Sequence, residues 1–158
     1  MFKKLLTTRS LCLSALIAAL YAALTLLLAP ISYGAIQCRV SEAMTVLPIL
    51  LPQAIPGLFV GCLIANLYTG VITDVIFGSL ATLIAAIGTY LLRKKPLLAA
   101  SCPVLANAVI VGLVLSLTNG WPVALTMLEV GAGEVAAVAL GMLVLLPALK
   151  RIDLTKYF

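Results

Sequence analysis

The chain has 158 residues, of which 64% are hydrophobic and only 9% carry a charged side chain. Soluble domains contain about 45–50% apolar and about 25% charged residues, so this composition excludes a water-soluble globule and indicates an integral membrane protein. The sequence has no histidine, which is the commonest general base and metal ligand, and no G-x-x-x-x-G-K-[ST] phosphate-binding motif. Because a spanning helix takes about 20 apolar residues, the length leaves no room for a nucleotide-binding domain.

We predict a single all-α membrane domain over residues 1–158, built of six transmembrane helices. The predicted helices cover about residues 9–29, 42–51, 55–67, 71–92, 97–117 and 122–149. The first apolar run is longer than the core of a signal peptide, about 7–15 residues, so we interpret it as a retained helix. The second and third helices are too short to cross about 30 Å of hydrocarbon, and we expect them to be tilted or shielded by neighbours.

Basic residues predict the orientation of the helices. They form three clusters, which are Lys3/Lys4/Arg9, Arg93/Lys94/Lys95 and Lys150/Arg151/Lys156. With six helices all three clusters fall on one side, and the positive-inside rule makes that side, and both termini, cytoplasmic. The net charge of +5 therefore reflects topology and anionic lipid, and no nucleic-acid partner is expected.

Ionisable and amide side chains stand out within the predicted spans, where such groups are costly and usually functional. These residues are Glu42, Asp74, Glu129, Glu134, Asn66 and Asn107, with Arg39 close by in the first external loop. A rise of about 1.5 Å per residue places all of them at the external face or in the outer to middle part of the membrane. The pattern predicts one polar pocket that opens outward and a closed cytoplasmic side.

Several of these residues also have a purely structural explanation. Asp74 could favour a helix start, Arg39 and Glu42 are three apart and could simply pair, and Asn107 could join two helices. Glu134 is the hardest to explain in this way, because no lysine or arginine is expected at its depth.

The first predicted helix carries small residues at a spacing of four, which lets another helix approach closely. They are Ala15, Ala18, Ala19, Ala22 and Ala23. This alanine stripe could pack within the chain, where Gly57 and Gly61 form a similar surface, or against a partner protein.

Five segments resemble the sequence pattern of the QueT-type proteins, the predicted queuosine-precursor S components of energy-coupling factor (ECF) transporters. The most specific segment runs from Gln37 to Pro48. The others are residues 55–66, 74–83, 103–112 and the pair Gly133-Glu134. The resemblance therefore covers nearly the whole chain.

The resemblance implies a six-helix S component in the bacterial plasma membrane, with both termini inside. Such proteins bind a micronutrient near the external surface, under the loop that joins the first two helices. A coupling transmembrane subunit and two ATPase subunits complete the transporter, so ATP and Mg²⁺ belong to the partners and no cofactor is expected here. The alanine stripe resembles the family's docking surface for the coupling subunit.

The ligand implied by the resemblance is a 7-deazaguanine such as preQ0, preQ1 or queuine. A carboxylate accepts both N–H donors of a guanine-like edge, and an amide donates to its carbonyl oxygen. We therefore expect Glu134 as the main acceptor and Asn107 as the second contact. The other candidate contacts are Arg39, Glu42, Asp74, Asn66 and Glu129, with Tyr33, Tyr68 and Trp121 as rings that could stack on the base.

Two other functions are alternatives to a substrate-capture subunit. A self-sufficient channel or exporter, acting as an oligomer, would carry charges along both halves of a pore, and the sequence has none in the inner half. An intramembrane enzyme would need a motif such as H-E-x-x-H or paired intramembrane aspartates, and neither occurs. We therefore expect a transporter subunit with no catalytic residue and no metal site.

Overall fold

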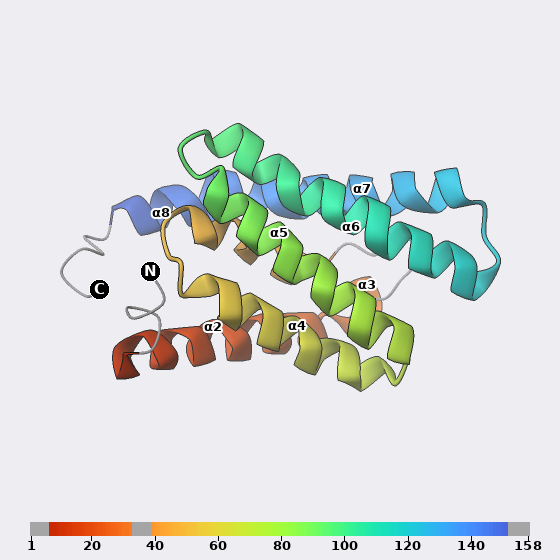
Figure 1. Cartoon of the computed structure of the whole chain (residues 1–158), viewed down its shortest axis with the longest axis horizontal. Helices are drawn as coiled ribbons and strands as arrows, with labels where there is room; N and C mark the ends of the chain where they lie inside the picture. The colour runs from red at the N-terminus through yellow and green to blue at the C-terminus, as the bar shows by residue number, and fades with distance from the viewer. Residues whose placement is uncertain (1–6, 33–38, 152–158) are drawn as a thin grey trace.

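The computed structural model describes residues 7–32 and 39–151, and these ranges are helical apart from short turns (Figure 1). The elements in chain order are α2 (Thr8–Leu27), α3 (Ala29–Ser32), η1 (Val40–Ile49), α4 (Ala54–Thr69), η2 (Asp74–Gly78), α5 (Ser79–Leu91), α6 (Pro96–Asn119), α7 (Val123–Leu140), η3 (Gly141–Leu145) and α8 (Leu146–Lys150). Of these, η1 is a 3₁₀ helix, and η2 and η3 are π-helical turns.

Four helical stretches of the described ranges are long and apolar enough to cross a membrane. They are Thr8–Leu27, Asp74–Leu91, Pro96–Asn119 and Val123–Lys150. The helices η1 and α4 are apolar but shorter. The prediction of an all-helical membrane protein is confirmed at this level, whereas six crossings with both termini in the cytoplasm stay a prediction.

The 3₁₀ helix η1 runs through the middle of the molecule. Every residue from Ser41 to Pro48 is buried, and η1 contacts α2, α4, α5, α6, α7 and η3. The sequence had predicted a helix over 42–51 without its type, and a 3₁₀ run of this length is uncommon. Its larger rise lets ten residues extend about 20 Å. The short helix is therefore shielded by neighbouring helices. This was one of the two expectations for it, the other being that it is tilted.

The helices predicted over 71–92 and 122–149 each contain a π-helical turn that the sequence did not indicate. The second turn, η3, lies against η1. At its first residue, Gly141, an added Cβ would collide with the carbonyl oxygen of Ala43. The absence of a side chain at Gly141 thus allows the two backbones to approach.

Helices α2 and α4 form a closely packed pair on one side of the molecule (Figure 1). An added Cβ at Gly61 would lie 2.8 Å from the carbonyl oxygen of Ala18, and one at Gly57 would lie 2.7 Å from that of Ser14. The Ser14 hydroxyl also donates to the carbonyl oxygen of Gln53, just before α4, at 2.8 Å. Gly57 and Gly61 of α4 therefore allow close contact with α2 within the chain.

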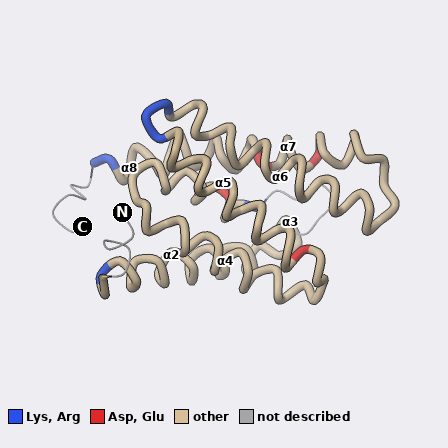
Figure 2. Tube along the Cα trace, viewed as in Figure 1, with Lys and Arg blue, Asp and Glu red and all other residues tan. Residues whose placement is uncertain are grey.

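The described basic residues other than Arg39 gather at one end of the molecule (Figure 2). That end contains the start of α2 with Arg9, the turn 92–95 between α5 and α6, and the end of α8 with Lys150 and Arg151. The described acidic residues all lie away from it (Figure 2). The clustering on one side agrees with the sequence prediction for the described residues, while Lys3, Lys4 and Lys156 lie outside them.

Candidate functional site

A small buried cavity between η1, η2, α6 and α7 collects the charged residues of the interior. Its lining residues are Arg39, Glu42, Gly78, Asn107, Val111, Val130 and Glu134. The four polar side chains among them are between 2% and 8% exposed. Four of the residues predicted from the sequence as ligand contacts therefore come together in one place, and we call this place the polar cavity.

Helical periodicity explains how the cavity is lined. In a 3₁₀ helix residues three apart lie above one another, so Arg39, which precedes η1, and Glu42 on its first turn face the same way. On α6, Asn107 and Val111 are four apart and share a face, and on α7 Val130 and Glu134 do the same. Each long helix thus contributes one polar and one aliphatic side chain to the cavity.

The polar cavity brings two carboxyl groups together with one amide and one guanidinium group. The Asn107 side chain lies within reach of a hydrogen bond to the carboxyl groups of both Glu42 and Glu134, and the charge of Arg39 acts on both. Glu42 Oε2 and Glu134 Oε1 are nevertheless buried without a hydrogen-bond partner among the described residues. Because a buried acceptor without a donor is costly, the site is suited to a ligand that brings N–H groups.

Tyr21 is a residue of the site that the sequence prediction missed. It is fully buried on α2, and its hydroxyl donates to Glu42 Oε1. A second bond, 2.7 Å between the hydroxyls of Thr25 and Ser41, also joins α2 to η1. The available signal was a tyrosine in the middle of an apolar helix, because a buried tyrosine hydroxyl usually has a polar partner.

The free volume of the polar cavity is about 10 Å³, which is close to the space that one water molecule needs. Pockets for organic ligands usually measure about 300–1,000 Å³. Binding of a ring compound therefore requires the lining side chains or helices to move apart. Residues 33–38 come directly before Arg39, and the predicted contact Tyr33 among them lies outside the described residues.

Asn66 and Asp74, also predicted as contacts, do not line the polar cavity. The Asn66 side chain is fully buried and donates to the backbone carbonyl of Asp74 at 3.0 Å. It also lies so near Gly78 that an added Cβ there would approach its amide nitrogen to 2.9 Å. Asn66 thus joins α4 to η2 and supports the cavity wall at Gly78 from behind.

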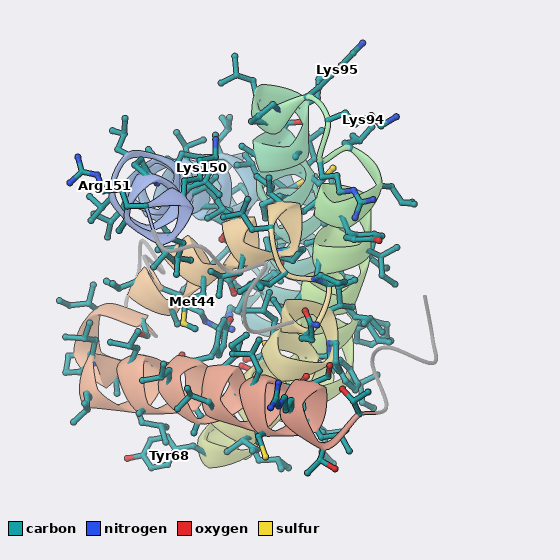
Figure 3. All side chains as sticks on the ribbon, turned by 90° about the vertical axis from the view of Figure 1, so that its left-hand side faces the viewer. Met44, Tyr68, Lys94, Lys95, Lys150 and Arg151 are labelled. Atoms are coloured by element: carbon teal, nitrogen blue, oxygen red, sulfur yellow. The ribbon has the colours of Figure 1, made fainter. Side chains whose placement is uncertain are left out.

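The remaining predicted contacts lie farther from the cavity. Glu129 and Trp121 line a separate surface hollow of about 270 Å³ together with Pro122, Leu125 and Thr126. Tyr68, near the end of α4, is 70% exposed and points away from the bundle (Figure 3). The structure therefore separates Glu129 from Glu134 on α7, as expected from their spacing of five residues.

The alanine stripe of α2 divides into two faces. Ala18 and Ala22 are 5% and 6% exposed, and Ala18 packs against Gly61 of α4. They therefore cannot present a surface to another protein without separating α2 from α4. Ala15, Ala19 and Ala23 are exposed, and only they are available to a partner.

Apolar helices that enclose a buried charged cavity are typical of membrane proteins that bind or move a polar solute. Residues 11–151 match the family model described as QueT transporter. The chain therefore belongs to the QueT transporter family, and the family's description agrees with the expectation of a transporter rather than an enzyme.

One curated relative is the "Queuosine precursor transporter QueT" of Lactococcus lactis subsp. cremoris (strain MG1363), which is 42% identical over 72 residues. This match spans 44% of the present chain and 43% of the relative. No solved structure matches the chain.

Proposed function

We propose that this protein is the substrate-capture subunit of an ECF-type importer in the bacterial plasma membrane, and that it binds a 7-deazaguanine in the polar cavity. The observation that carries the proposal is the pair of buried carboxyl groups, Glu42 and Glu134, with acceptor oxygens that no described residue satisfies. Family membership and the name of the Lactococcus relative support a queuosine precursor as the transported compound.

The chemistry of a 7-deazaguanine complements the cavity. The N1–H and 2-amino groups of the base donate to the Glu134 carboxylate, and such a bidentate, charge-assisted contact is strong. The Asn107 amide and the Arg39 guanidinium can donate to the O6 acceptor. Val111 and Val130 offer an aliphatic surface to the planar ring.

Energy for uptake comes from partner subunits in this proposal. The sequence has no phosphate-binding loop, so a coupling transmembrane subunit and two ATPases, which use ATP and Mg²⁺, complete the importer. The exposed alanines Ala15, Ala19 and Ala23 form the docking face for the coupling subunit, because small residues allow close approach of a second helix.

The proposal is tested by titrating the purified protein with preQ1, preQ0 and queuine in a calorimeter. Glu134→Gln should weaken binding by roughly tenfold to a hundredfold, because a hydrogen bond to a charged group contributes about 1.5–3 kcal/mol. Glu129→Gln is the matched control, since it changes a glutamate of the same helix that lies in the separate hollow.

Equal effects of the two substitutions, or unchanged binding in Glu134→Gln, would contradict the assignment of the cavity. Mass spectrometry of the compound that copurifies with the chain identifies the natural ligand. Purification as an oligomeric pore without ligand would instead support the channel or exporter alternative.

A further inference from the structure

A second opening, much larger than the polar cavity, lies on another side of η1. It has a volume of about 470 Å³, and all of its 14 lining residues are aliphatic or methionine. One wall is α2, the other is formed by α7, η3 and α8, and Met44 of η1 lies between them (Figure 3). We call this opening the apolar groove.

The groove has the length of one membrane leaflet. Its α2 wall runs from Leu13 to Leu24, which at about 1.5 Å per residue extends about 16 Å. The opposite wall runs from Leu140 to Leu149 and extends about 14 Å by the same rise. Half of a hydrocarbon core of about 30 Å is about 15 Å, so both walls match one layer of acyl chains.

The groove ends where the basic residues gather. Arg9 precedes Leu13 by four residues and so lies on the same face of α2. On the other wall Lys150 directly follows Leu149, and Arg151 comes next. Figure 3 shows Lys150 and Arg151 on the side of the molecule where Met44 lies. Cations therefore border one end of the groove.

No described acidic residue opposes these cations. The four described carboxylate residues, Glu42, Asp74, Glu129 and Glu134, all lie away from the basic end (Figure 2). Within the described ranges, no carboxylate group therefore neutralises the positive charge at the mouth of the groove; Asp153 lies outside these ranges.

We propose that the apolar groove binds an acyl chain of one anionic phospholipid, whose phosphate is held by Arg9, Lys150 and Arg151. A basic site beside membrane helices on the cytoplasmic side is typical for recognition of anionic lipid headgroups. The inference rests on membership of a membrane transporter family and is independent of the ligand in the polar cavity.

A lipid fits the groove better than a helix of another protein does. A helix with its side chains is about 10–12 Å wide. Binding of such a helix would not require a groove that is one leaflet long or that has cations at one end. On a helical wheel, the groove residue Leu20 lies about 100° from the exposed Ala19, and Leu16 lies about 60° from it. The lipid and the proposed coupling subunit therefore use adjacent faces of α2.

The inference is tested by native mass spectrometry of the purified protein after incubation with phosphatidylglycerol or phosphatidylcholine of identical acyl chains. The wild-type protein should retain one phosphatidylglycerol per chain, and about tenfold less phosphatidylcholine. Changing Arg9, Lys150 and Arg151 together to glutamine should reduce phosphatidylglycerol retention by at least roughly tenfold. Val144→Trp, which fills the groove from an exposed position, should also abolish retention.

Two matched controls accompany these variants. Leu143→Trp adds the same ring at the neighbouring residue, which is 77% exposed and does not line the groove. Changing Arg93, Lys94 and Lys95 to glutamine removes three cations at the same end of the molecule (Figure 2). Both controls should retain phosphatidylglycerol as the wild-type protein does.

Equal retention of the two lipids would overturn the proposal, as would full retention in Val144→Trp. An equal loss in the Arg93/Lys94/Lys95 variant would overturn it as well, because retention would then reflect only net charge. Loss of a copurifying protein subunit in Val144→Trp, with lipid retention unchanged, would assign the groove to a protein partner instead. Failure of deazaguanine binding would leave these outcomes unaffected.

Discussion

The polar cavity and the apolar groove lie on different faces of the same ten-residue helix, η1. The cavity has a volume of about 10 Å³ and four polar side chains, whereas the groove has about 470 Å³ and none. Of these two openings, only the smaller one thus has side chains that could select a hydrogen-bonding solute. The larger opening offers only apolar surface and no hydrogen-bonding side chain, which suits an acyl chain.

The 3₁₀ geometry of η1 explains how one short helix serves both openings. Three residues per turn place Arg39 and Glu42 on one face and Val40 and Ala43 on the next. The first pair lines the cavity, and the second pair lines the groove. Substitutions that affect the cavity alone, both openings or neither opening therefore test whether the polar cavity and the apolar groove act independently.

The largest effect on stability is expected at Gly141, where η3 packs against η1. Gly141→Val places a side chain against the carbonyl oxygen of Ala43 and should disturb cavity and groove together. Overpacking of this kind costs about 1–3 kcal/mol or more, which corresponds to a fall in Tm on the order of 5–10 °C. A thermal-shift measurement in detergent checks this expectation.

Ala139→Val serves as the control for Gly141→Val. It introduces the same β-branched residue two positions earlier, at an exposed site of α7. Valine is a better helix former than glycine but a poorer one than alanine. A fall in Tm as large in Ala139→Val as in Gly141→Val would therefore contradict the view that contact with η1 sets the size of the effect.

The next effect concerns a surface that belongs to neither opening. Changing Ala15 and Ala19 to leucine should abolish uptake by cells, because bulky side chains prevent close approach of the coupling subunit. Ligand binding and phosphatidylglycerol retention by the purified variant should stay unchanged, since both residues are exposed and line neither opening.

A double change of Ala132 and Ala136 to leucine provides the control for this experiment. These exposed alanines of α7 have the same spacing of four residues, and their replacement should leave uptake intact. Loss of ligand binding together with uptake in the Ala15/Ala19 variant would indicate a packing role for the stripe.

The smallest effect is expected on the cavity side alone. Tyr21→Phe removes the hydroxyl that donates to Glu42, and it should weaken deazaguanine binding about fivefold, since one hydrogen bond contributes about 1 kcal/mol net. Lipid retention should not change. Tyr90→Phe is the control, because Tyr90 lies on α5 beside Arg93 at the basic end of the molecule. A loss of lipid retention in Tyr21→Phe would contradict the separation of the two regions.

Part of the candidate site could be predicted from the sequence. Charged and amide residues in an apolar chain are few, so Arg39, Glu42, Asn107 and Glu134 could be named without coordinates. The same reasoning also named Asn66 and Glu129, which lie elsewhere. Estimates of depth along separate helices do not say which faces of those helices meet.

The sequence by itself determined that this is an all-helical membrane protein with basic residues at one end, because composition and the spacing of apolar runs depend on no distant contact. Only the tertiary structure decided that η1 is a buried 3₁₀ helix, that Tyr21 reaches Glu42, and that Ala18 faces α4 while Ala15 is exposed. These features arise from packing between helices far apart in the chain. Local residue preferences do not encode which neighbours a helix face will meet.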